Sequence, residues 1–215
     1  MNAVLKKTMQ SLESALRYNP DSLDLMASLA EVYIRMGRFD QRTMELCEAV
    51  LRHHSDNALL RQAQSIGMLI EQSRAIEAGL HASDPIPDRD TLASSLAILE
   101  EFLVQSPECT DGWLAWTRFQ FLIGDYVQAR RGIRRLADME TPDLCQTFRN
   151  CLERVAADPE LTSEQARHLA AIYPLLGAEP QVLGLFEKRY DGGQLSVGDT
   201  LLQTYLDRYP PSRPL

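Results

Sequence analysis

The chain has 215 residues, a formal net charge of −8 and a hydrophobic fraction of 45%. This composition fits one or two folded domains with a sizeable core, and the even spread of apolar residues argues against disorder. The acidic balance disfavours nucleic-acid binding, which needs a broad positive surface. No run approaches the eighteen or so apolar residues that cross a bilayer.

The first predicted helix covers residues 4–18. Its two lysines are not followed by an uninterrupted apolar stretch, so the segment is not expected to be a secretory signal. Helical spacing gives it an apolar face made by Val4, Leu5, Met9, Leu12 and Leu16. Because no predicted helix precedes it, we expect this face to pack against a partner subunit, a second copy of the chain or the long helix after Asn57.

A pair of helices is predicted around the next turn. Pro20 stops the first helix of the chain, and Asp21 or Ser22 can cap the helix that follows. Gly37 can adopt the left-handed conformation that ends this second helix, and the ring of Phe39 can wedge between the two helices of the pair. The short turn predicts adjacent antiparallel helices. The buried stripe before the turn contains Met26, Leu29, Ala30, Tyr33 and Ile34.

A long helix is predicted from Asn57 to Leu80, without an internal glycine turn. The segment after it, HASDPIPDRD, carries two prolines and three aspartates and has the composition of a loop. We therefore place a boundary at residues 82–89. It separates an N-terminal helical segment, residues 1–81, from a C-terminal helical segment, residues 90–215.

The first helix pair recurs further along the chain. Six positions match residues that lie 87 positions later, namely Leu12 and Leu99, Leu16 and Leu103, Pro20 and Pro107, Asp24 and Asp111, Gly37 and Gly124, and Phe39 and Tyr126. Both copies predict a helix, a proline stop, a second helix, a glycine, an aromatic residue and a third helix. Such internal repeats are typical of helical repeat proteins.

The rest of the chain also predicts helices. Thr141 can cap a helix that opens at Pro142 and runs to about Ala157. Capping-box or near-capping-box spacing occurs twice more, in Thr162 with Gln165 and in Ser196 with Asp199. No segment alternates between polar and apolar residues in the way a strand requires. The sequence therefore predicts an all-α protein of about eleven helices.

These helix pairs resemble tetratricopeptide repeats, in which two helices of fixed pattern recur about every 34 residues. In the first copy the pattern positions hold Met26, Leu29, Ala30, Tyr33, Leu46 and Ala49, with Arg42 in place of an alanine. The second copy holds Trp113, Trp116, Thr117, Gly124, Asp125, Tyr126 and Ala129, and a weaker third holds Ala166, Leu169, Ala170, Tyr173, Gly177 and Phe186. The resemblance implies a right-handed α-solenoid, a superhelix of antiparallel helix pairs. The glycines at 37, 124 and 177 are not separated by multiples of 34 residues, so the array is expected to be irregular.

The resemblance also implies a binding groove, because the first helices of such repeats line a concave surface that holds a peptide or helix. Ala27 and Glu31 replace the lysine and asparagine of the family's carboxylate clamp, so an amphipathic helix or extended peptide is favoured over an acidic C-terminus. Phe121 is expected to point into the groove. The groove positions are Asp24, Ala27, Glu31, Ile34, Asp111, Leu114, Arg118, Phe121, Glu164, Arg167 and Ala171.

A cluster of four arginines is the most prominent charged feature of the sequence. The members are Arg130, Arg131, Arg134 and Arg135. Two i,i+4 pairs of like charge share one helix, which is unfavourable without counter-charges. The cluster either binds an acidic partner segment or forms ion pairs with Asp125, Asp138 or a neighbouring helix.

Few residues of the sequence could form a catalytic or metal-binding site. None of the four histidines pairs with cysteine or another histidine at metal-ligand spacing, and no nucleotide-binding or nucleophile motif occurs. The four cysteines are Cys47, Cys109, Cys145 and Cys151. They form no CxxC pair and lie within helical patterns, so we expect them to be buried free thiols of a cytoplasmic protein. We therefore expect no catalytic site, metal or cofactor.

The expected function is that of a protein-interaction scaffold, an adaptor or assembly factor that binds a partner peptide or helix in the groove of the superhelix. A homodimer through the N-terminal helix is one possible assembly. The alternative is a regulatory helical module that senses a small ligand or a signalling protein. A convergent set of polar residues, as an enzyme requires, is not evident.

Overall fold

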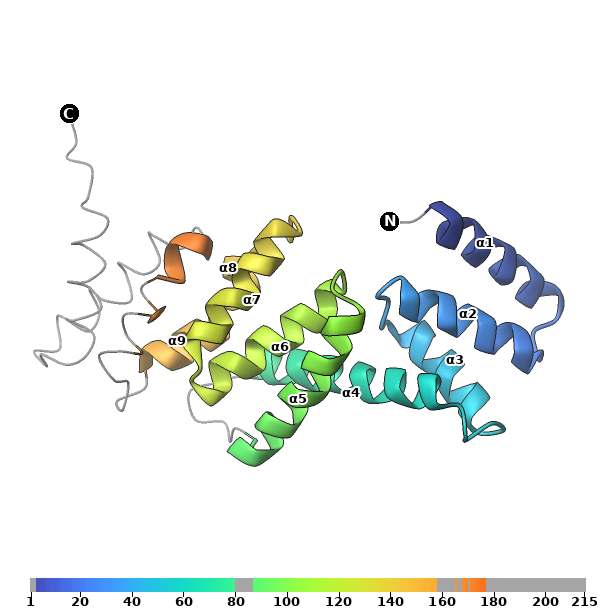
Figure 1. Ribbon diagram of the computed structural model, residues 1–215, viewed down its shortest axis with the longest axis horizontal. Coiled ribbons are helices and arrows are strands. Elements are labelled where there is room, and N and C mark those ends of the chain that lie inside the picture. Colours follow the sequence, from blue (N-terminus) through green and yellow to red (C-terminus); the bar gives the residue numbers. More distant parts are fainter. Residues whose placement is uncertain (1–2, 80–86, 158–164, 166–167, 170, 177–215) are drawn as a thin grey trace, which may run out of the picture. The chain divides into compact units, whose positions relative to one another are not determined.

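The computed structural model describes residues 3–79, 87–157, 165, 168–169 and 171–176. This part of the chain contains nine α-helices and one 3₁₀ helix, η1, and no strand, which confirms the all-α prediction for it (Figure 1). The elements are α1 (Ala3–Tyr18), α2 (Leu23–Arg35), α3 (Gln41–Leu51), α4 (Ala58–Gly79), α5 (Arg89–Gln105), α6 (Thr110–Ile123), α7 (Tyr126–Asp138), α8 (Leu144–Thr147), α9 (Arg149–Ala157) and η1 (Tyr173–Leu176).

Several predicted features lie outside the described residues. They are the groove positions Glu164 and Arg167, most of the third repeat copy, the capping pairs at Thr162 and Ser196, and most of the predicted loop. The long helix predicted after Asn57 is confirmed as α4.

The chain divides into two compact units. The first comprises Met1–Arg74 and Ala97–Ala115, and the second comprises Ala75–Leu96 and Trp116–Leu215. Helices α4, α5 and α6 therefore contribute residues to both units. The boundary proposed at residues 82–89 stays a prediction.

In the first unit, α1, α2 and α3 follow one another and pack antiparallel (Figure 1). Helix α1 lies against α2. Leu16 is buried in this contact, and the Tyr33 hydroxyl donates a hydrogen bond of 2.6 Å to Glu13 Oε1. Val4, at the start of the same helix, remains 69% exposed.

The turn between α2 and α3 has the predicted left-handed glycine. Gly37 has a φ of 70°, and its N–H and that of Arg38 donate to the carbonyls of Ile34 and Tyr33. These two bonds form a Schellman motif, which ends a helix by satisfying its last carbonyls. Ser22 caps the start of α2, and Asp40 caps α3 by accepting a hydrogen bond of 2.9 Å from Thr43 N–H.

This turn packs closely against the corner between α5 and α6 within the first unit. The ring of Phe39 meets the ring of Phe102 edge to face, with centroids 5.3 Å apart. The Cys109 thiol lies 3.6 Å from the carbonyl oxygen of Gly37. A methyl group on Gly37 would lie 3.3 Å from Cys109 Cα. Phe39 is therefore buried, and it reaches beyond its own helix pair to α5.

The second unit contains a turn of the same construction between α6 and α7. Gly124 has a φ of 83°, and the N–H groups of Gly124 and Asp125 donate to the carbonyls of Phe121 and Gln120. Asp125 then caps α7 through Gln128 N–H at 3.0 Å. The prediction that Gly37 and Gly124 are left-handed turn glycines is confirmed.

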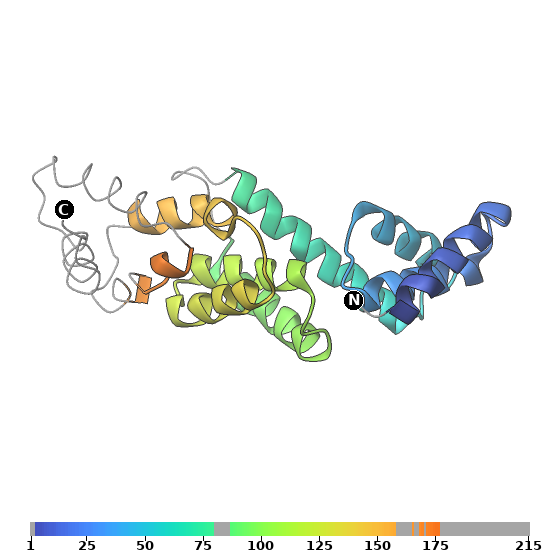
Figure 2. The ribbon, with the colours of Figure 1, turned by 90° about the horizontal axis from the view of Figure 1, so that it is seen from above.

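Helices α6 and α7 lie side by side, as Figure 2 also shows. Gly132 permits this close approach, because a methyl group there would lie 2.0 Å from Thr117 Oγ1. Gly67 of α4 has a similar position in the first unit, where a methyl group would lie 2.2 Å from the flexible thioether of Met44. Glycine thus sets the packing distance of α6 and α7, whereas at Gly67 the thioether of Met44 can move aside.

The helix predicted from Thr141 to about Ala157 is wrong in its start and its continuity. Helix α7 ends in a third Schellman motif, in which Thr141 N–H donates to the Leu136 carbonyl and Glu140 has a φ of 55°. Asp143 is also left-handed, with a φ of 50°. These two residues delay the next helix to Leu144, and a break at Phe148 divides it into α8 and α9.

Candidate functional site

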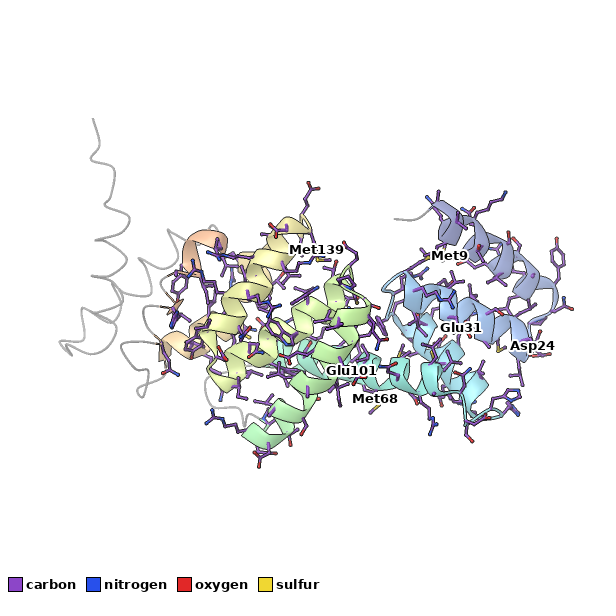
Figure 3. All side chains as sticks on the ribbon, viewed as in Figure 1. Met9, Asp24, Glu31, Met68, Glu101 and Met139 are labelled. Carbon is purple, nitrogen blue, oxygen red and sulfur yellow. The ribbon has the colours of Figure 1, made fainter. Side chains whose placement is uncertain are left out.

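The groove positions predicted on α2 lie partly on the surface of the first unit. Asp24 is exposed, Ala27 and Glu31 are half-buried, and Ile34 belongs to the core. Figure 3 shows Asp24 near the start of α2 and Glu31 further along the same helix. Glu31 forms an ion pair of 3.6 Å with Arg35. Three of the four predicted positions are thus accessible to a partner on one helix face.

The groove positions predicted on α6 are less accessible. Asp111 and Leu114, in the first unit, are half-buried, and Asp111 Oδ1 lies 2.9 Å from Arg74 Nη2. Arg118 and Phe121, in the second unit, are 8% and 2% exposed. The Phe121 ring packs between other aromatic rings, with centroids 5.7 Å from Phe148 and 6.2 Å from Tyr126. Its side chain is part of the core and does not face solvent.

Arg118 belongs to a buried polar cluster in the second unit, together with Glu77, Asn150 and Cys151. The Glu77 side chain is 12% exposed, and its Oε2 lies 4.0 Å from Arg118 Nε and 2.8 Å from Cys151 Sγ. Its Oε1 accepts a hydrogen bond of 3.0 Å from Asn150 N–H. The Arg118 guanidinium also lies 5.8 Å from the centre of the Phe148 ring.

This polar cluster joins the end of α4 to the start of α9. The Glu77 carboxylate caps the first turn of α9, and the Asn150 side-chain amide donates to the Glu77 carbonyl near the end of α4. Burial and the neighbouring carboxylate of Glu77 raise the pKa of the Cys151 thiol well above its ordinary value. A neutral thiol is a poor nucleophile, so the geometry favours a structural role for the cluster.

Sequence reasoning missed this cluster, because Glu77 and Asn150 are 73 positions apart. The sequence carries no signal for it, because the break at Phe148, which leaves the first turn of α9 to be capped from elsewhere, appears only in the fold.

The four arginines of α7 divide into two kinds. Arg131 and Arg134 are exposed, whereas Arg130 and Arg135 are half-buried. Neither Arg131 nor Arg134 forms an ion pair or a side-chain hydrogen bond with another residue in the part of the chain that the structure describes. The predicted pairing with Asp125 or Asp138 therefore does not account for these two side chains.

An open pocket of about 520 Å³ lies at the end of α7 in the second unit. Most of its exposed lining surface is polar; the lining residues are Ala137, Thr141, Asp143, Leu144, Cys145, Leu175 and Leu176. The buried Thr141 Oγ1 makes no hydrogen bond within the described structure. The pocket therefore has the size of a small-molecule site and a largely polar surface.

Cys47 and Cys109 offer little reactivity. Burial raises the pKa of the Cys47 and Cys109 thiols to about 11. Among the described residues, no three His, Cys, Asp or Glu side chains converge as a metal ion would require. None of the helices described combines the length and hydropathy needed to cross a lipid bilayer.

No protein-family model matches the sequence, and no curated protein is significantly similar to it. The accessible strip on α2, the exposed arginines of α7 and the pocket at the end of α7 are thus the candidate sites that the fold itself provides.

Proposed function

We propose that the chain is a tetratricopeptide-like interaction module, an adaptor or assembly factor that binds a segment of another protein. The observation that carries the proposal is the repeated turn. Gly37 and Gly124 have the same left-handed conformation, the same pair of helix-ending hydrogen bonds and an aspartate cap on the next helix. Two helix pairs built on one pattern favour a right-handed superhelix, whose first helices would line a groove.

The accessible strip on α2 is the best candidate for that groove in the first unit. Asp24, Ala27 and Glu31 are spaced by three and four residues, which places them on one face of the helix. Two carboxylates beside a small residue suit an amphipathic or extended peptide that carries basic residues. A cytoplasmic, non-catalytic role agrees with the buried, neutral thiols.

The alternative function is a regulatory module that senses a small ligand. The pocket at the end of α7 favours it, because a volume of about 520 Å³ suits a small molecule and the lining offers mostly polar surface to it. A ligand of this kind would stabilise the second unit on binding. Thermal-shift screening of the purified chain against small metabolites tests this alternative.

The protein-binding proposal is tested by affinity capture with the full chain as bait, followed by mass spectrometry. A double charge reversal, Asp24→Lys with Glu31→Lys, should remove at least one captured protein. The matched control is Glu45→Lys with Glu48→Lys, which makes the same charge change on the exposed face of α3. Circular dichroism verifies that both variants stay folded. If both variants capture the same proteins as the wild type, α2 is not the binding surface.

A further inference from the structure

Helix α7 presents a narrow exposed strip made by Val127, Arg131 and Arg134. These residues are spaced by four and three positions, which aligns their side chains along one face. The Val127 side chain is 51% exposed, and both arginines are exposed. The opposite face of the helix is buried, and Gly132 packs there against Thr117 of α6. The strip therefore points away from the contact with α6.

The charge of this helix is opposite to that of the chain. Helix α7 contains four arginines and one aspartate, whereas the whole chain has a net charge of −8. Some arginines on other helices pair with a carboxylate one turn away, as Arg35 does with Glu31 and Arg42 with Glu45. On α7 the side chain four positions before Arg131 is Val127, and the one four positions before Arg134 is another arginine. Like charges at this spacing repel each other.

We propose that this strip binds an acidic, amphipathic helix of a partner protein, which places carboxylates on Arg131 and Arg134 and an apolar side chain on Val127. Guanidinium groups bind carboxylates through two parallel hydrogen bonds, and two arginines at a spacing of three match carboxylates three or four residues apart on a facing helix. The partner relieves the repulsion within the arginine cluster and covers the exposed valine. This inference deepens the proposed protein-binding function, on which it rests.

A nucleic acid is a poorer occupant of the same strip. Nucleic acids carry a dense charge along their whole length, so their binding requires a broad positive surface. Here two exposed arginines, which form no ion pair among the described residues, lie on a chain that is acidic as a whole. Attraction at the strip is local, because screening at physiological salt limits it to roughly 8 Å. A short acidic segment can place its carboxylates within this distance of Arg131 and Arg134, whereas most phosphates of a long nucleic acid would lie beyond it.

The test uses a fluorescein-labelled helical peptide of about twelve residues, with glutamates at i and i+3 and leucines on the same face. Fluorescence anisotropy at about 50 mM salt should show saturable binding to the full-length protein, which weakens as salt is added. The same peptide with glutamine in place of glutamate should bind at least about tenfold more weakly. Arg131→Glu with Arg134→Glu should weaken binding of the acidic peptide by at least about tenfold.

The matched control is Arg17→Glu with Arg61→Glu. Both of these arginines are exposed, and the substitution changes the net charge by the same amount on other helices. The control should retain binding within about threefold, and the uncharged pair Arg131→Gln with Arg134→Gln should lose it. Three results would overturn the proposal: absence of binding at low salt, equal loss in both charge-reversed variants, or tighter binding of a single-stranded oligonucleotide of similar length.

Failure here is distinguishable from failure of the proposed function. The capture experiment depends on Asp24 and Glu31 of α2, whereas the peptide experiment depends on Arg131 and Arg134 of α7. A chain that captures a partner through α2 but does not bind the acidic peptide remains an interaction module without an acidic-partner site on α7. A chain that binds the peptide through α7 alone keeps this inference and moves the binding surface away from α2.

Discussion

The turn at Gly37 gives the sharpest test of how this fold is held together. Replacing Gly37 with alanine adds a methyl group to a residue with a φ of 70°. For a residue with a Cβ, the left-handed conformation lowers the free energy of unfolding by about 1–2 kcal/mol. The lower entropy of the unfolded chain offsets about 0.4–1 kcal/mol of this loss. The torsional effect alone is therefore a loss of roughly 1 kcal/mol.

A second cost arises from packing within the first unit. The added methyl group would lie 3.3 Å from Cys109 Cα, a backbone atom at the start of α6 that cannot rotate away. Small overpacking of this kind costs about 1 kcal/mol or more. Gly124→Ala is the matched control, because its φ is 83° but its nearest contact is the flexible amide of Gln165. We expect losses of roughly 2 kcal/mol at Gly37 and roughly 1 kcal/mol at Gly124.

The assay is guanidinium unfolding followed by circular dichroism, with the wild type and both variants measured together. Gly37→Asn adds a third comparison, because asparagine tolerates the left-handed conformation but still carries a Cβ. It should recover only part of the loss caused by alanine. If Gly37→Ala is no more destabilising than Gly124→Ala, the contact with Cys109 does not contribute and the packing argument fails.

Five further substitutions test other parts of the fold by the same unfolding assay. Glu140→Gly should stabilise by about 0.5–1 kcal/mol by relieving its left-handed backbone, and a loss would contradict the strain argument. Gly132→Ala should cost roughly 1–3 kcal/mol by overpacking α6, whereas Gly67→Ala, which meets only a flexible thioether, should stay within about 1 kcal/mol of the wild type; equal effects would refute the distinction. Glu77→Ala should cost at least about 1–3 kcal/mol by removing both the cap of α9 and the counter-charge of Arg118, and an unchanged midpoint would contradict both roles. Burial tends to raise the pKa of Asp40, but hydrogen bonds from the Arg38 guanidinium and Thr43 outweigh it and lower the pKa below the ordinary 3.8. The wild type should therefore lose stability as the pH falls below 3.8, and Asp40→Asn, which keeps a capping oxygen, should show a smaller loss.

Local sequence signals predicted the local structure well. The proline stop, the capping residues and the glycines at 37 and 124 each act within a few residues of the chain, so their geometry could be read without the fold. The prediction of a helix start at Thr141 was wrong because it also relied on local signals alone. A threonine before a proline is a strong start signal, but Glu140 and Asp143 occupy left-handed conformations that their residue types do not announce.

The candidate sites were harder to predict, because exposure depends on which helices meet. Arg118 and Phe121 hold positions on α6 that a repeat pattern assigns to a groove. In the second unit Phe148 packs against Phe121, and Glu77 lies beside Arg118. Neither neighbour belongs to the repeat pattern, so no count of positions along α6 could reveal that both side chains are buried.

The contrast between Arg118 and Arg131 shows what decides whether an arginine in this chain can serve a partner. Both were assigned to binding surfaces from the sequence. Arg118 has a carboxylate within 4.0 Å and an aromatic ring beside it in the core, so releasing it for a partner would remove a buried charge from its counter-charge. Arg131 is already exposed and has no ion pair within the described residues, so a carboxylate from a partner would add an interaction without breaking one. Binding through α7 therefore requires no rearrangement of the second unit, whereas binding through Arg118 requires α4, α6 and α9 to give up their shared contacts.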